Sequence, residues 1–130
     1  MSFIAKLQLQ HEEEMSVLRC SFRFNQAIDA TGKPAAMPQG GTISLVLISN
    51  GQAGLFDWMI SPVQTRNGKI TFIRYDTMSK LKVLEFENAH CVEYFESFDQ
   101  MGDHPLQIQL TLSAHIIKLN EATFKNNWPV

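Results

Sequence analysis

The sequence is poor in cysteine, in charge of one sign and in long hydrophobic runs, and each shortage excludes a class of protein. Two cysteines, Cys20 and Cys91, occur in 130 residues, which is too few for a disulfide scaffold. The net charge of −2 gives no reason to expect binding to nucleic acid, which usually needs a basic face. No window approaches the roughly 18 apolar residues that a membrane-spanning helix needs, so we expect no direct insertion into a membrane.

The N-terminus also lacks an export signal. The opening "MSFIAKLQLQ" has no basic region followed by an unbroken apolar core, as a secretory signal peptide would. We therefore predict a protein that starts in the cytoplasm and that, if exported, uses a route without a cleaved signal. In a reducing cytoplasm both cysteines are expected to be thiols. The length fits a single domain over residues 1–130.

Residues arranged for catalysis or for metal binding are missing as well. The four histidines stand singly, without the spacing of metal ligands. His90 adjoins Cys91, but neighbours on a strand point to opposite faces and cannot form a dyad. The "TGKP" stretch resembles a phosphate loop, yet Ala27 stands where the first glycine is needed and Pro34 where Ser or Thr is needed. We expect no catalytic residue, no metal and no cofactor, and we predict that the protein is not an enzyme.

Period-two alternation of apolar and polar residues dominates the chain and predicts a mainly β protein. Strands are expected in "FIAKLQLQ", "SVLRCSFRFNQ", "TISLVLIS", "KITFIRY" and "LKVLEFENAHCVEYF". In the second of these, the expected inward residues are Leu18, Cys20, Phe22 and Phe24. The "HEEE" turn between the first two strands is interpreted as solvated, and "DTMS" is expected to form a hairpin turn.

The clearest and last predicted strand is "LQIQLTLSAHIIKL". Its fourteen residues would extend roughly 46 Å if straight, so we expect it to bend around a barrel or sandwich. One face of this strand is expected to hold Leu106, Ile108, Leu110, Leu112, Ala114 and Ile116.

One segment breaks the alternation and predicts a short helix. "AGLFDWMIS" is apolar on nearly every side, and Pro62 ends it soon after Ile60. Such a helix must be covered on more than one side. Two interpretations remain open: the helix plugs the end of a barrel, or part of it packs on another subunit.

Apolar residues on both faces of "ISLVLI" also indicate self-association, because an antiparallel sheet normally turns one face to water. The residues expected at a subunit interface are Val46, Ile48, Leu55, Phe56, Trp58 and Met59.

The order of these segments resembles the type VI secretion tube protein, the Hcp or TssD family, in its divergent TssD branch. The resemblance rests on "MSFIAKLQL", "VLRCSFRFNQAIDATGKP", "GGTISLVLIS", "LFDWM", "NGKITFIRYD", "LKVLEFENAHCVEYFESFDQMGDHPLQIQLTLSA" and the "NNWP" tail. The better-known branch usually opens with a "GES"-like turn. "HEEE" stands in its place here, so properties of that turn are not carried over.

The resemblance implies an antiparallel two-sheet β-barrel with one short flanking α-helix. It further implies a homohexameric ring, stacked head to tail into a hollow tube that a contractile sheath propels. Spike and baseplate proteins would be partners, small effector proteins would travel in the lumen, and the type VI apparatus would export the tube.

The long, weakly hydrophobic loop before "TISLVLIS" is near the upper limit of ordinary connections, where function or disorder is expected. The resemblance implies that it connects one ring to the next. The expected ring-stacking residues are Asp29, Ala30, Thr31, Gly32, Lys33, Pro34, Ala35, Ala36, Met37, Pro38 and Gln39. The alternative function is a barrel that binds a small ligand, and an enzyme is the third choice.

Overall fold

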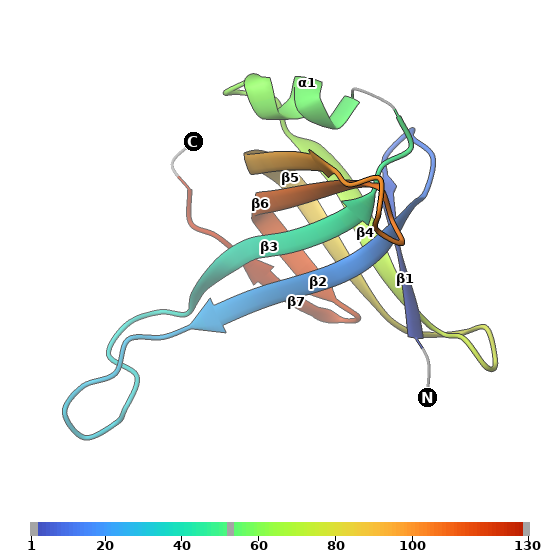
Figure 1. Cartoon of the computed structure of the whole chain (residues 1–130). Coiled ribbons are helices and arrows are strands. Elements are labelled where there is room, and N and C mark those ends of the chain that lie inside the picture. The colour runs from blue at the N-terminus through green and yellow to red at the C-terminus, as the bar shows by residue number, and fades with distance from the viewer. Residues whose placement is uncertain (1–2, 52–53, 129–130) are drawn as a thin grey trace.

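The computed structural model describes residues 3–51 and 54–128, and in these residues it contains seven strands and one helix (Figure 1). The elements are β1 (Phe3–Leu9), β2 (Met15–Asn25), β3 (Gln39–Ile48), α1 (Gly54–Ile60), β4 (Arg66–Arg74), β5 (Ser79–Phe98), β6 (Leu106–Leu119) and β7 (Ala122–Lys125).

The strands form an antiparallel barrel. Their order is β3-β2-β1-β4-β5-β6-β7, and an additional pairing between β3 and β6 closes the ring. Hydrogen bonding therefore continues around the barrel, although closure is uneven because β1 and β2 share only three residue pairs. The mainly β, antiparallel barrel with one short helix that the sequence predicts is confirmed.

Facing apolar rows on β3 and β6 build the centre of the core. Leu45 pairs with Leu110 and Leu47 with Ile108, and each is at most 2% exposed. These residues sit at alternate positions because successive side chains on a strand point to opposite faces. The expected inward face of the last long strand is confirmed from Ile108 to Ala114.

The predicted inward residues are wrong at positions in two strands, β2 and β6. In β2 the register shifts between Val17 and Arg19, so Val17 packs on the core and Leu18 is 36% exposed. A bulge of this kind moves the following side chains to the other phase. Phe24 is likewise exposed, at 40%. In β6, Ile117 is buried where Ile116 was expected. It pairs with the buried Phe86 of β5, and both strands change the side that faces the core between this pair and Ala89–Ala114. Asn88, which lies between the two pairs in β5, has a positive φ of 52°.

The strand β7 was not predicted. It follows β6 through a short turn in which Asn120 adopts a positive φ of 56°, and it pairs with the C-terminal end of β6. Four residues, of which Phe124 alone is strongly apolar, are too few to show alternation. The expected last strand is therefore the penultimate one.

The helix α1 lies across one end of the barrel (Figure 1). Its Leu55 and Trp58 are buried in the core cluster, whereas Phe56 and Ile60 are 47% and 62% exposed. The helix thus covers its own barrel with one side and leaves an apolar side uncovered. In the described residues, no helix combines the length and the apolarity that crossing a membrane would require.

The connection between β2 and β3 projects from the barrel as a long arm (Figure 1). It has internal structure, because Ile28 and Pro34 form an isolated antiparallel bridge. The arm leaves the end of β2 that is farthest from the β1–β2 turn.

Candidate functional site

Four strands, in the order β2-β3-β6-β5, form a sheet with two edges that lack a strand partner. β2 pairs with β1 only up to Val17, and from Arg19 onward its partner is β3 alone. β5 pairs with β4 only up to Ala89, and beyond that point its partner is β6 alone. Within the described ranges, no other backbone hydrogen bond reaches either edge. Unpaired edges of this length are templates for pairing with another chain.

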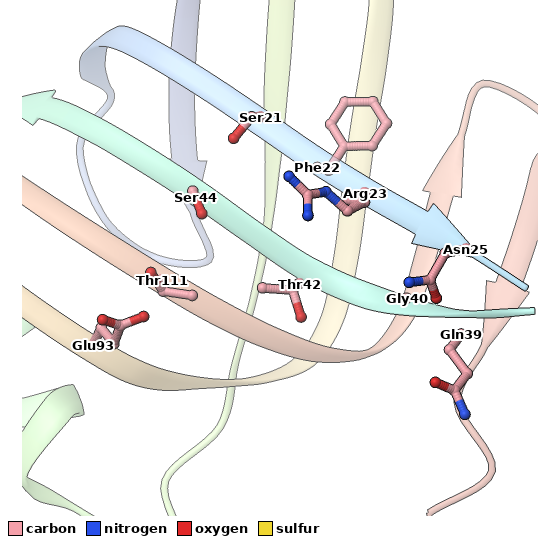
Figure 2. Close-up of a pocket in the computed structure, with 10 residues that line it drawn as sticks. All are labelled: Ser21, Phe22, Arg23, Asn25, Gln39, Gly40, Thr42, Ser44, Glu93 and Thr111. Carbon is pink, nitrogen blue, oxygen red and sulfur yellow. The ribbon is translucent and has the colours of Figure 1, made fainter. Parts of the chain in front are cut away.

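Polar side chains cross the outer face of this four-stranded sheet in straight rows. Ser44 pairs with Ser21 on one side and with Thr111 on the other, and Thr111 pairs with Glu93. Figure 2 shows these four side chains in sequence across the strands. The next row has the same character and contains Arg23, Thr42, Ser113 and His90.

These rows border an open hollow of about 760 Å³ on the outer face (Figure 2). Its lining is rich in hydroxyl and amide groups, with a cation at Arg23 and an anion at Glu93. The opposite face of the same strands is filled by the apolar core, including the fully buried Phe86 and Trp58. The expected alternative, a ligand held inside the barrel, therefore gains no support from the described residues.

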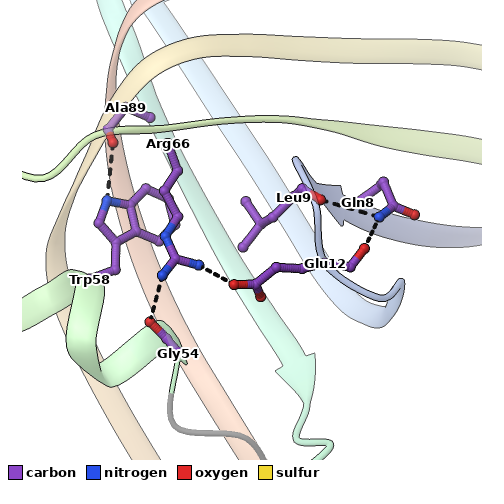
Figure 3. Close-up of polar contacts among 7 residues, drawn as sticks. All are labelled: Gln8, Leu9, Glu12, Gly54, Trp58, Arg66 and Ala89. Carbon is purple, nitrogen blue, oxygen red and sulfur yellow. Dashed lines mark hydrogen bonds and ion pairs between the residues drawn. The ribbon is translucent and has the colours of Figure 1, made fainter.

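The helix α1 is fastened beside the β5 edge by Arg66 (Figure 3). The Arg66 guanidinium donates to Glu12 Oε1 at 2.7 Å and to the Gly54 carbonyl oxygen at 3.1 Å. It also lies 5.5 Å from the centroid of the Trp58 ring, within the range of a cation–π interaction. Glu12 is therefore an ion-pair partner, and the expectation that the whole "HEEE" turn is solvated is wrong at this residue.

Trp58 in turn donates its indole N–H to the carbonyl oxygen of Ala89 at 3.2 Å. This bond joins the helix to the point at which β5 parts from β4. A ring contact between Phe56 and Tyr94, with centroids 5.8 Å apart, extends the junction along β5. The helix and the unpaired part of β5 are thus neighbours.

The interface residues expected from the sequence lie in two regions. Val46 and Ile48 are half-buried on the outer face of β3, which lies between β2 and β6 and is not itself an unpaired edge. In the helix, Leu55 and Trp58 are covered by their own chain, and Met59 is half-buried. The helix residue that offers exposed apolar surface beside β5 is Phe56.

All the expected ring-stacking residues are exposed: Asp29–Pro38 lie in the arm, and Gln39 is the first residue of β3. Asp29 organises the tip of the arm, since Oδ1 accepts from Thr31 N at 2.8 Å, Thr31 Oγ1 at 2.6 Å and Lys33 N at 3.2 Å. These hydrogen bonds lower the pKa of the Asp29 carboxyl from its usual value, chiefly through the Thr31 hydroxyl. Ile28 and Met37 are 65% and 80% exposed, so the arm also presents apolar surface.

The C-terminal segment contacts the same sheet, which the sequence did not indicate. Asn126 Nδ2 donates to the carbonyl oxygens of Gly40 at 3.0 Å and Ala114 at 2.8 Å, bridging β3 and β6 where they diverge. Trp128 stacks on His115, with ring centroids 5.1 Å apart, and lies 5.7 Å from His90. These contacts join residues far apart in the chain, so no local pattern announces them.

The cysteines and acidic groups form no reactive constellation in the ranges that the structure covers. Burial raises the pKa of both Cys20 and Cys91 to about 11, which disfavours the thiolate needed by a nucleophile. No cluster of three or more potential metal-binding side chains occurs among the described residues. The unpaired edges of β2 and β5 are suited to pairing with strands of another chain, and the described residues give no support for catalysis.

Comparisons with known proteins agree with the resemblance inferred from the sequence. The family model described as "Hemolysin coregulated protein Hcp (TssD)" matches residues 1–129. Hcp1 from Flavobacterium johnsoniae is 32% identical, with 95% of this chain and 99% of that chain covered, at a TM-score of 0.88. No curated protein matches the chain.

More distant solved structures share the fold. Hcp1 from Salmonella typhimurium has 13% identity and a TM-score of 0.74, covering 95% of this chain and 92% of that chain. The Hcp1 protein from the E. coli EAEC 042 pathovar has 12% identity and a TM-score of 0.75, covering 98% and 100%. Because the family model spans nearly the whole sequence, the chain belongs to the hemolysin coregulated protein Hcp (TssD) family.

Proposed function

We propose that this chain is the subunit of the inner tube of a type VI secretion system, and that six copies close into a ring. Membership of the Hcp (TssD) family supports the tube role. The observation that carries the ring is the four-stranded sheet with its two unpaired edges on β2 and β5.

The directions of the strands favour joining one edge to the other. Each step from β2 through β3 and β6 to β5 is antiparallel, so β5 runs opposite to β2. When β5 of one copy lies beside β2 of the next, the antiparallel ladder continues without interruption. Such a head-to-tail contact is heterologous, and it generates a closed ring when the rotation between copies closes.

In this ring the outer face of the four strands lines the lumen. The rows of Ser21, Ser44 and Thr111 would then present hydroxyl groups to anything inside the tube. A polar wall offers weak, reversible contacts, because each hydrogen bond to it replaces one to water. This property suits a conduit through which small effector proteins pass.

The arm between β2 and β3 would connect stacked rings. Its position at one end of β2, far from the β1–β2 turn, suits a head-to-tail contact between one ring and the next. The exposed Ile28 and Met37 would be covered by the neighbouring ring, and Asp29 would hold the tip in shape. Residues Asp29–Gln39 are therefore the proposed stacking segment.

The expected interface residues take different roles in this arrangement. Phe56 lies beside the β5 edge, next to Tyr94, and would contact the adjoining copy together with the half-buried Met59. Leu55 and Trp58 would support that surface from within the chain. Val46 and Ile48 lie on the face that would line the lumen.

The finished tube would be enclosed and propelled by a contractile sheath, with spike and baseplate proteins at its end. The type VI apparatus would carry it to the medium or into a target cell. Light scattering on the purified protein tests the ring. We expect a mass near six times 14.8 kDa, and a strict monomer at high concentration would contradict the proposal.

A further inference from the structure

Opposite charges occupy the two unpaired edges of the four-stranded sheet. Arg19 and Arg23 are exposed on the outer face of β2, and Glu93 is exposed on β5. The ion pairs formed among the described residues join Arg66 to Glu12 and Lys118 to Glu87. The three edge charges therefore have no ion-pair partner within the described part of their own chain.

The register of the sheet determines where these charges meet in a ring of the proposed kind. Glu93 ends the row that begins at Ser21. If that row continues into the next copy, Glu93 faces the partner's β2 at about one strand spacing, roughly 4.8 Å. Arg19 and Arg23 flank Ser21 by two residues on the same face. Diagonal neighbours of this kind lie about 7–8 Å apart, within reach of long side chains.

We propose that Glu93 of each copy forms an ion-pair cluster with Arg19 and Arg23 of the next copy, and that this cluster selects the register and the partner edge. The inference rests on the proposed ring. A slip of one residue would bring Glu93 opposite the core-facing Cys20 or Phe22 and separate it from both arginines. Contact between two β2 edges would place arginines against arginines, so the charges also disfavour a symmetric dimer.

Charge reversal tests the cluster. We compare Glu93→Arg, the pair Arg19→Glu with Arg23→Glu, and the triple variant that carries all three changes. Glu121→Arg, in the exposed β6–β7 turn, is the matched control for Glu93→Arg, because both substitutions change the net charge by the same amount. Sedimentation gives the protein concentration at which half of the copies are dissociated, and circular dichroism checks that each variant is folded.

We expect Glu93→Arg and the double arginine variant to raise the concentration of half dissociation by about tenfold or more, since close charge pairs across interfaces couple strongly. The triple variant should recover most of the lost affinity between copies, and Glu121→Arg should dissociate at the same concentration as the wild type. A folded Glu93→Arg protein with unchanged dissociation, or a triple variant without recovery, would overturn the cluster while leaving the ring intact. A monomeric wild type would instead refute the ring.

Discussion

The side-chain amide of Asn126 occupies the space that a Cβ atom on Gly41 would need. Gly41 is buried and has a φ of +94°, a conformation that glycine adopts without cost. The two residues lie where β3 and β6 part, and the Asn126 amide bonds to both strands there. The C-terminal segment therefore closes the end of the four-stranded sheet and belongs to the fold.

This relationship predicts a steric penalty at Gly41. Gly41→Ala should lower the free energy of unfolding by about 2–4 kcal/mol, from backbone strain together with displacement of the amide. Gly32→Ala is the control, because Gly32 has a similar φ of +88° with open space around it. It should cost only about 1 kcal/mol. Urea unfolding measures the free energy of unfolding of both variants, and equal losses of stability would contradict the steric role of Asn126.

Deleting Thr31–Met37 should separate ring formation from ring stacking. The arm contributes no residue to the barrel core, so the shortened protein should fold and keep its ring. It should fail to form tubes and should not be secreted, because the proposed contact between rings is removed. Electron microscopy and a secretion assay follow the two outcomes, and normal tubes from the deletion variant would refute the stacking role.

Aspartate substitutions distinguish the lumen face from the interface. Phe56→Asp should shift the protein towards monomers, because Phe56 lies beside the proposed contact edge. Ile48→Asp should leave the mass in solution unchanged, since Ile48 lies on the outer face of β3, where it pairs with Gln107 and not with an edge arginine. If Ile48→Asp dissociates the protein while Phe56→Asp does not, the interface predicted around β3 is favoured over the edge-to-edge ring.

The buried thiols should make stability fall at high pH. Burial raises the pKa of Cys20 and Cys91 from the usual 9.0 to about 11 in the folded protein. Because the folded-state pKa is raised, the protonated thiols stabilise the folded protein fully below pH 9, the pKa of the unfolded state. This contribution to the free energy of unfolding is lost as pH rises from 9 through 11. We expect the free energy of unfolding to drop over that window. The loss should be smaller in a Cys20→Ala, Cys91→Ala variant, and identical pH profiles would contradict the assignment.

Sequence reasoning succeeded where one strand keeps one pair of partners. The first part of β6 alternates strictly, and its inward residues, including Leu110, were predicted from that period. Sequence reasoning failed at Leu18 and Ile117, because a bulge or a change of the buried side depends on pairing with strands elsewhere in the chain. The same limit applies to the site.

No local pattern shows that Glu12 would reach Arg66, 54 residues away, or that Asn126 would bridge two strands. The unpaired edges were also beyond sequence reasoning, since an edge is defined by which strands are absent beside it. The family resemblance supplied the ring and the stacking arm as expectations. The positions of Arg23 and Glu93 at opposite edges emerged only from the register.

A reconstruction of the assembled particle by electron microscopy tests the central claim most directly. The account predicts a six-fold ring in which β5 of each copy lies antiparallel to β2 of the next and the row containing Ser44 and Thr111 faces the lumen. A ring whose β2 and β5 edges both face solvent, or whose hydroxyl rows point outward, would contradict it.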